Sequence, residues 1–331
     1  MDNTDSDMWS GLLDSGIATF MGKETRNPME SDVSDMDVGV VGFPFDSTCI
    51  SRTGTNRGPR AIRDASSQTI DYHYEYDVDL ASEYTTVDCG DVPVLPGNAE
   101  TSLERGAELL GTVLDADAVP VMLGGDHVVT VAGVNALGER ADNPGLVLID
   151  THLDTATDVG GERYNHCCPI TRAVDEAGFD PENISIIGPS GAMNPREELE
   201  YVIDQGINLF PLDEVVQRGP ETVARDAVAA ANDGTDSVYL TVDVDALDAA
   251  YAPGTGVPTA GGMMARELLQ IVGVIASEGI TAMDVVETSP QWDPSDITAR
   301  MAVRVVVDAL AANALGEANG VGSGTRAGRN S

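Results

Sequence analysis

The stretch "GLVLIDTHLD" (residues 145–154) joins an aliphatic run to three side chains that can bind metal. The run is apolar almost throughout, as is typical of a strand that is covered on both faces. Asp150, His152 and Asp154 follow at intervals of two, so in an extended segment their side chains point the same way. His152 is one of only four histidines in the chain, and it lies between two aspartates.

Other aliphatic runs resemble this one and predict further strands. They cover residues 38–43, 120–125, 184–188, 237–245 and 280–287. Helical patterns at 99–116, 221–233 and 265–277 lie between them. Alternation of strands and helices predicts an α/β fold, a three-layer arrangement in which helices cover both faces of a mostly parallel central sheet.

The chain is predicted to form a single domain. Its 331 residues contain no internal repeat and no Pro/Ser-rich linker that would divide it. We expect an irregular acidic segment over residues 1–35, one folded domain over 36–315, and a flexible tail rich in Gly, Ser and Asn over 316–331.

The formal net charge of −37 excludes several classes of partner. It opposes binding to nucleic acid and to anionic membranes, because both would repel the chain. Our hypothesis is that the acidity is surface charge adapted to high salt, where screening weakens self-repulsion. The chain has no apolar run of about 20 residues and no basic signal region at its start. Its four cysteines lack a disulfide or CxxC spacing, so a cytoplasmic location is expected.

Three predicted strands end in metal-binding side chains. Besides Asp150, His152 and Asp154, "LGGDH" (123–127) supplies His127, and "LTVDVD" (240–245) supplies Asp243 and Asp245. Any one of these motifs alone is more often a helix cap or a turn. Together they place so many carboxylates at the carboxyl edge of one sheet that cations are needed among them.

The types of side chain indicate which ions these would be. Carboxylates with a minority of imidazole, and no thiolate, suit divalent ions such as Mn²⁺. Six ligands suit two ions bridged by carboxylates, which can share a water and lower its pKa. The pattern therefore predicts metal-assisted hydrolysis.

Three segments resemble the signatures of the ureohydrolase (arginase/agmatinase) family: "GGDH" (124–127), "DTHLD" (150–154) and "TVDVDALDAAYAPGTGVPTAGG" (241–262). The resemblance extends to "RGPRAIRDAS" (57–66) and "MDVVETSP" (283–290). It implies a single arginase-like catalytic domain with two Mn²⁺ ions per chain, Ni²⁺ being an alternative. It also implies a homo-oligomer, either a trimer or a hexamer.

The resemblance implies two overlapping sets of metal ligands. One ion would be held by His127, Asp150, Asp154 and Asp243, and the other by His152, Asp150, Asp243 and Asp245. In this arrangement Asp150 and Asp243 bridge the two ions.

The resemblance also implies three catalytic residues. Asp154 would pass a proton to the leaving amine, and Glu287 would pair with the guanidinium group of the substrate. His166 would shuttle protons or position the substrate, although a solvated loop histidine is the alternative. The remaining histidine, His73, matches no role in the family and is expected to be a surface or packing residue.

Several positions depart from the family pattern. Val128, Thr151, Thr241 and Ala249 replace Ser, Ala, Ser and Pro, which are usual there, and none of these changes removes a metal ligand. "HCCP" replaces a sequence like "HGTP", so Cys167 and Cys168 either pack in the interior or reshape the substrate pocket.

The implied reaction converts a guanidino compound to urea and an amine. Residues 155–166 lack the Asn/Ser-rich pattern with which arginases bind an amino acid, so agmatine, giving putrescine, is the expected substrate. Guanidinobutyrate, guanidinopropionate, guanidine and arginine remain alternatives, whereas formiminoglutamase members usually lack a counterpart of His166. From other classes, a non-catalytic metal-bound partner subunit and a single-metal deacetylase remain open.

Overall fold

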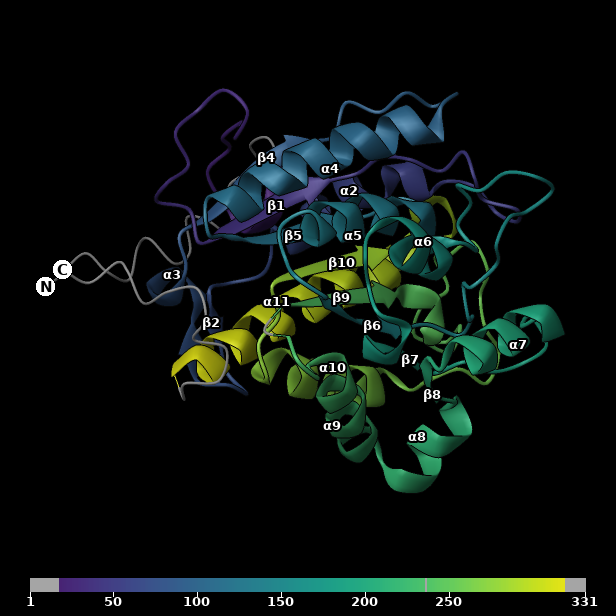
Figure 1. Cartoon of the computed structure of the whole chain (residues 1–331). Coiled ribbons are helices and arrows are strands. Elements are labelled where there is room, and N and C mark those ends of the chain that lie inside the picture. Colours follow the sequence, from purple (N-terminus) through teal and green to yellow (C-terminus); the bar gives the residue numbers. More distant parts are fainter. Residues whose placement is uncertain (1–17, 236, 319–331) are drawn as a thin grey trace, which may run out of the picture.

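The computed structural model describes residues 18–235 and 237–318 (Figure 1). Its centre is a sheet of eight strands, and every pair of neighbouring strands is parallel. The strands are β1 (Val38–Gly42), β4 (Thr86–Asp91), β5 (Val119–Leu123), β6 (Gly145–Ile149), β7 (Ile184–Ile187), β8 (Asn208–Phe210), β9 (Val238–Asp243) and β10 (Ala282–Val286). Their order across the sheet is β4-β1-β5-β10-β9-β6-β7-β8.

Helices cover both faces of the sheet. One layer contains α4 (Ala99–Asp115), α5 (Thr130–Gly138) and α6 (Pro169–Glu176). The other contains α2 (Gly58–Ser66), α9 (Pro220–Ala231), α10 (Ala265–Ser277) and α11 (Ile297–Ala318). In Figure 1, α4 lies at the top, with α9 and α10 below the sheet. Strands β1, β6 and β10 are buried along their whole length, which confirms that their apolar runs are covered on both faces.

Smaller elements lie at the margins of these layers. A hairpin of β2 (Tyr72–His73) and β3 (Val78–Asp79) leads into the short helix α3 (Leu80–Glu83). Helices α7 (Arg196–Gln205) and α8 (Leu212–Arg218) flank β8 in the chain. Among the described residues, no helix is long and apolar enough to cross a bilayer.

The predicted α/β fold is confirmed, and the sheet is parallel throughout. All six predicted strands and all three predicted helices form within a few residues of the expected bounds. Two strands of the central sheet and the two short strands of the β2–β3 hairpin were not predicted from the sequence. Strand β4 lies at a sheet edge and carries Asp88 and Asp91, so it lacks an aliphatic pattern, and β8 has only three half-buried residues.

The predicted terminal segments are only partly described. Residues 18–35 contain one short 3₁₀ turn, η1 (Phe20–Gly22), and are otherwise irregular, whereas residues 1–17 and 319–331 lie outside the described residues. Helix α11 continues to Ala318, three residues into the predicted tail. The glycine in this last turn has a packing reason, because a Cβ on Gly316 would lie 2.3 Å from the carbonyl oxygen of Ser277.

A buried ion pair fixes the β4 edge to α2. The Arg63 guanidinium donates to both carboxylate oxygens of Asp88 at 2.8 and 2.9 Å, and to Asp91 at 2.6 Å. The side chains of Arg63 and Asp88 are 8% and 2% exposed. The Asp88 carboxylate also accepts from the backbone N–H of Phe20, which ties the N-terminal segment to the same edge.

Replacing Arg63 with Met should lower the free energy of unfolding by about 3–5 kcal/mol, because it leaves the buried Asp88 carboxylate without its cation. Urea unfolding monitored by circular dichroism measures this. Arg60→Met is the control: Arg60 lies on the same helix, but its side chain is 86% exposed. Equal stability of the two variants would contradict a structural role for the pair.

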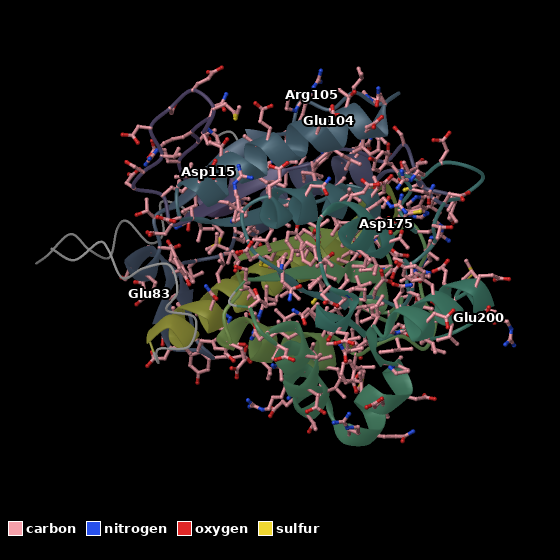
Figure 2. All side chains as sticks on the ribbon, viewed as in Figure 1. Glu83, Glu104, Arg105, Asp115, Asp175 and Glu200 are labelled. Atoms are coloured by element: carbon pink, nitrogen blue, oxygen red, sulfur yellow. The ribbon has the colours of Figure 1, made fainter. Side chains whose placement is uncertain are left out.

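Acidic side chains cover the outside of the molecule. Figure 2 labels five of them on four helices, α3, α4, α6 and α7: Glu83, Glu104, Asp115, Asp175 and Glu200 are all exposed, as is Arg105 beside Glu104. With 55 acidic and 18 basic residues, this surface repels itself unless ions screen it.

We expect the midpoint of thermal unfolding to rise as KCl is added up to molar concentrations. At 1 M salt the Debye length is about 3 Å, so repulsion between most surface carboxylates is screened. Thermal melts over a KCl series test this. A higher midpoint at low salt would refute the hypothesis of salt adaptation.

Candidate metal centre

Four adjacent strands deliver the predicted site residues to one edge of the sheet, except His166, which lies in the loop before α6. Their order is β5-β10-β9-β6, so their carboxyl ends lie side by side. His127 begins the 3₁₀ turn η3 (His127–Val129) after β5, Asp150 follows β6, and Glu287 follows β10. Asp243 ends β9, and Asp245 lies in the next turn, η5 (Val244–Ala246).

The first group of potential ligands surrounds the imidazole of His127. Its Nδ1 lies 2.8 Å from Asp154 Oδ2, 3.1 Å from Asp150 Oδ2 and 3.3 Å from Asp243 Oδ2. All four side chains are less than 10% exposed. These are the four residues that the family resemblance implied as ligands of one ion.

The second group surrounds His152. Its Nδ1 lies 3.2 Å from Asp150 Oδ1 and 3.3 Å from Asp245 Oδ2. Asp150 therefore directs one carboxylate oxygen to each group, as a bridging ligand would. Asp243 contacts the first group, while its Oδ1 accepts a hydrogen bond from the backbone N–H of Asp245 at 2.7 Å. The bridging role of Asp243 stays a prediction.

The electrostatics of the two groups fit bound cations. His127 Nδ1, Asp150 Oδ2 and Asp245 Oδ1 are buried and have no hydrogen-bond partner among the described residues. Burial and the nearby Asp150 charge raise the pKa of Asp245 to about 7. Burial and the charges of Asp245 and Asp150 raise the pKa of Asp243 well above its ordinary value. The groups thus hold more negative charge than their imidazoles neutralise, and an N/O donor set of this kind suits Mn²⁺.

Two of the predicted catalytic residues have an uncommon backbone conformation. Asp154 has φ of 50° and Glu287 has φ of 65°, both in the left-handed region that residues other than glycine rarely occupy. Such strain is held by the surrounding structure and is concentrated at functional sites. Two backbone segments also pack closely near the site: a Cβ on Gly125 would lie 1.8 Å from the carbonyl oxygen of Phe45.

A chain of hydroxyl groups behind His127 orients its imidazole. Asp284 Oδ2 accepts from the hydroxyls of Thr130 and Tyr239, each at 2.8 Å. Because the Thr130 hydroxyl donates there, its oxygen is free to accept from Thr241 at 3.4 Å. Thr241 can then accept from His127 Nε2 at 3.1 Å, which leaves Nδ1 with the lone pair that a metal requires.

Sequence reasoning missed the role of this network. Thr241 was noticed only as a replacement for serine, and its hydroxyl keeps the acceptor that the imidazole needs. Asp284 gave a usable signal, because it is the one charged residue in the apolar run of β10, and a polar residue buried in such a strand requires partners.

Replacing Asp284 with Asn should weaken Mn²⁺ binding about 10- to 100-fold, because an amide can donate to Thr130 and so reverse the hydroxyl chain. Titration of metal-free protein with Mn²⁺ measures the affinity. Tyr239→Phe is the control, because it removes one donor to the same oxygen and leaves the chain from Thr130 to His127 in place. Unchanged affinity in a folded Asp284→Asn variant would contradict the orienting role.

Glu287 and His166 form a pair beside the first group. Glu287 Oε1 accepts from the backbone N–H of His127 at 2.9 Å and lies 3.2 Å from His166 Nδ1. The backbone N–H of Ile50 donates to His166 Nε2, so Nδ1 carries the proton and donates to Glu287. His166 is 8% exposed, so the interpretation as a solvated loop histidine is wrong.

Most of the positions that depart from the family pattern, and His73, are buried in the structure. Val128 and Cys168 are fully buried, and Cys168 fits the packing interpretation. Cys167 is half-buried beside His166, and Thr151 is buried with its hydroxyl 3.0 Å from that of Ser190. His73 is buried against α11, with Nε2 2.7 Å from Asp308, so it is a packing residue rather than a surface residue.

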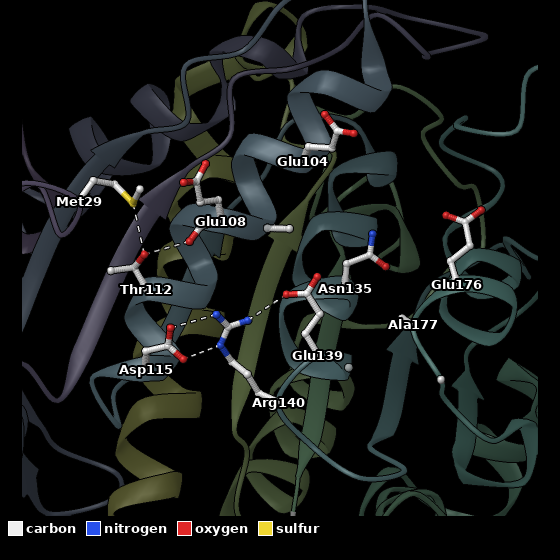
Figure 3. Close-up of a pocket in the computed structure, with 13 residues that line it drawn as sticks. Met29, Glu104, Glu108, Thr112, Asp115, Asn135, Glu139, Arg140, Glu176 and Ala177 are labelled. Atoms are coloured by element: carbon white, nitrogen blue, oxygen red, sulfur yellow. Dashed lines mark hydrogen bonds and ion pairs between the residues drawn. The ribbon is translucent and has the colours of Figure 1, made fainter.

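A surface hollow of about 770 Å³ lies elsewhere, between α4, α5 and α6 (Figure 3). Its lining includes the acidic residues Glu104, Glu108, Asp115 and Glu139. Arg140 also lines it and forms ion pairs with Asp115 and Glu139. None of the predicted metal ligands lines this hollow. The predicted site at the strand ends is therefore separate from this hollow.

Comparison with known proteins identifies the class of protein. The model of the arginase family matches residues 36–312. Guanidinopropionase from Pseudomonas aeruginosa is 34% identical over 299 residues, which cover 89% of this chain and 91% of that protein. Agmatinase from Bacillus cereus is 34% identical over 281 residues, 82% of this chain and 90% of the relative. The solved structure of proclavaminate amidinohydrolase from Streptomyces clavuligerus is 30% identical with a TM-score of 0.84, covering 91% and 98% of the two chains.

The chain belongs to the arginase family. Its sheet and helices have the arginase-like arrangement that the resemblance implied. It is a metal-dependent ureohydrolase that acts on linear amidines, and its substrate is a guanidino compound. The names of these relatives refer to different substrates.

Proposed function

We propose that the protein hydrolyses agmatine to putrescine and urea, with two Mn²⁺ ions held by the groups around His127 and His152. The observation that carries the proposal is a second acidic position near the site. Glu198 on α7 is half-buried, and its carboxylate lies 3.4 Å from the backbone N–H of Thr155, directly after Asp154. Agmatine carries a cation at each end, so two separate carboxylates suit it better than they suit a guanidino acid.

Each residue has a distinct task in this proposal. When bound, the metal ions supply a water of lowered pKa as the nucleophile. Glu287 Oε1 is already engaged by His127 and His166, so its buried, unpartnered Oε2 is the acceptor left for the guanidinium N–H groups. Asp154 passes a proton to the leaving amine. His166 holds Glu287 in place through its Nδ1–H.

The charge around Glu198 supports its role at the far end of the substrate. Burial and the charge of Asp154 raise the pKa of Glu198 to about 7, so the Glu198 carboxylate is close enough to be repelled by the carboxylates of the predicted metal ligands. An ammonium group beside it would relieve that repulsion. A substrate carboxylate in the same place would increase it.

One observation favours a guanidino acid as the second candidate. Arg52 is exposed, and its guanidinium lies 5.0 Å from the ring centre of Trp292. No ion pair joins it to a carboxylate within the described part of the chain. A Cβ on Gly256 would lie 3.1 Å from both the backbone oxygen of Arg52 and Glu287 Oε2, so the Arg52 backbone lies close to the acceptor proposed for the guanidinium group. A free cation held on an aromatic ring there could bind a substrate carboxylate.

A urea-release panel separates the two candidates. Agmatine, arginine, guanidinobutyrate, guanidinopropionate and guanidine are compared, first with Mn²⁺ and then with Ni²⁺. If agmatine is the substrate, Glu198→Gln lowers its kcat/KM about tenfold, which corresponds to about 1.4 kcal/mol of charge-assisted binding. The control is Glu200→Gln, which removes an exposed carboxylate from the same helix. Preference for a guanidino acid, lost in Arg52→Gln, would overturn the agmatine proposal.

We also propose that the chain assembles into a homotrimer or homohexamer. The support is the family resemblance, since the described residues come from one chain. Light scattering after size-exclusion chromatography in high salt measures the mass. A monomer under those conditions would contradict this proposal.

A further inference from the structure

A second type of metal-binding cluster lies beside the predicted centre. Cys49, His166 and Glu287 each offer one ligand atom, and these three atoms lie within 4.8 Å of one another. The cluster differs chemically from the two carboxylate groups because it contains a sulfur. Cys49 comes from the loop after β1, so the loop brings a thiol to residues that the family pattern assigns to the substrate.

The cluster contains one carboxylate oxygen without a hydrogen-bond partner and one residue that is partly exposed to solvent. Glu287 is 2% exposed, and its Oε2 has no hydrogen-bond partner in the described structure. Cys49 is half-buried, so this residue of the cluster is in partial contact with solvent, unlike Glu287. The sulfur makes only a weak contact at 3.8 Å with the hydroxyl of Thr55, which is itself buried.

We propose that Cys49, His166 and Glu287 form a third cation site, which binds a thiophilic divalent ion such as Zn²⁺ and thereby excludes the substrate. Sulfur, imidazole nitrogen and one carboxylate oxygen form a donor set that Zn²⁺ accepts, with the fourth position left to water. Mn²⁺ prefers oxygen-rich sites, so it has little affinity for this cluster.

Charges around the cluster favour a cation. The fully buried Asp126 carboxylate accepts from the backbone N–H and the hydroxyl of Thr48, the residue before Cys49, so Asp126 and Glu287 place two carboxylates beside the cluster. Burial and the same two carboxylates raise the pKa of the Cys49 thiol, so the thiol is protonated until an ion displaces its proton to solvent. The ligand nitrogen of His166 gives up one hydrogen bond, either to Glu287 or from Ile50.

Occupancy of this site competes with the substrate through a shared atom. Glu287 Oε2 is the acceptor that the proposed function reserves for the guanidinium group. Inhibition by Zn²⁺ should therefore be competitive with the guanidino substrate. This part rests on the proposed role of Glu287, whereas binding of the ion does not.

Binding is tested with Co²⁺, whose bond to a thiolate gives a near-ultraviolet charge-transfer absorption. The Mn²⁺-loaded protein is titrated with Co²⁺. Exchange of Co²⁺ into the predicted binuclear centre gives no such absorption, because those ligands are imidazoles and carboxylates alone. We expect the absorption in the unaltered protein, and its loss in Cys49→Ser.

Matched cysteine variants make the assignment specific. Cys89→Ser changes a buried cysteine that is not part of the cluster and should keep the absorption. Absence of the absorption in the unaltered protein would overturn the proposal. Its persistence in Cys49→Ser with loss in Cys167→Ser would also overturn it, because the thiolate would then belong to Cys167.

Inhibition by Zn²⁺ is measured independently of the Co²⁺ absorption. With whichever guanidino compound the panel identifies, Zn²⁺ should raise the apparent KM without changing kcat, and Cys49→Ser should abolish that effect. Noncompetitive inhibition that persists in Cys49→Ser would overturn the exclusion of substrate. A failure of the agmatine proposal changes the substrate used here and leaves the Co²⁺ absorption unaffected.

Discussion

An Asp150→Asn variant should bind almost no Mn²⁺ and lose at least about a hundredfold in kcat, because even a residue that only orients a metal ligand costs 10–100-fold. Asp150 directs one oxygen to each histidine, 3.1 Å from His127 Nδ1 and 3.2 Å from His152 Nδ1. The amide has one oxygen and no charge, so it cannot serve both groups. Metal content by atomic emission, together with urea release, measures the two losses.

Two further variants define what that result means. His152→Ala removes a ligand from one group only, so it should leave about one ion per chain with very low turnover. Asp204→Asn makes the same chemical change at an exposed position of α7 and should behave like the unaltered protein. Full metal content in a folded Asp150→Asn variant would refute its place as the bridging ligand.

A Glu287→Gln variant should retain its metal while kcat/KM falls by about two to three orders of magnitude. Loss of one partner of a buried charge pair costs about 3–5 kcal/mol, and the guanidinium would face a neutral amide in place of Glu287 Oε2. The side chain keeps its size, and its amide oxygen can still accept from the backbone N–H of His127. Steady-state kinetics with metal content measured on the same sample separates binding of substrate from binding of metal.

The exposed Glu200→Gln variant is the control for the same chemical change. Reduced metal content in Glu287→Gln would show that Glu287 supports the metal centre instead of the substrate. Full activity with full metal content would remove Glu287 from the proposed mechanism.

Much of the fold and the centre of the site could be predicted from the sequence. Strands buried on both faces have a nearly continuous apolar pattern, so β6 and β9 were visible and their ends could be located. The structure brings Asp150, His152 and Asp154 to the two groups of ligands, although the segment bends after Asp150 and Asp154 has a positive φ, so they do not line one extended strand.

Other features depend on contacts across long separations in the chain. No local pattern links Asp284 to Thr130, which lies 154 residues earlier. The positive φ of Asp154 and Glu287 opposes their intrinsic preference, so it depends on the surrounding tertiary structure. Glu198 reads as an ordinary polar residue of α7, since its relevance comes from a contact with the segment after Asp154.

The position of β10 has a consequence for how the chain folds as it is synthesised. Strands β4, β1 and β5 form one block and β9, β6, β7 and β8 another, and only β10 joins them. It comes from residues 282–286, so the ribosome has made most of the chain before the two blocks can close into one sheet. Until then His127 and the five aspartate and histidine ligands that follow it in sequence lie on separate blocks. A nascent chain therefore cannot bring His127 to Asp150, Asp154 and Asp243 before β10 emerges, whereas the group around His152 comes from a single block.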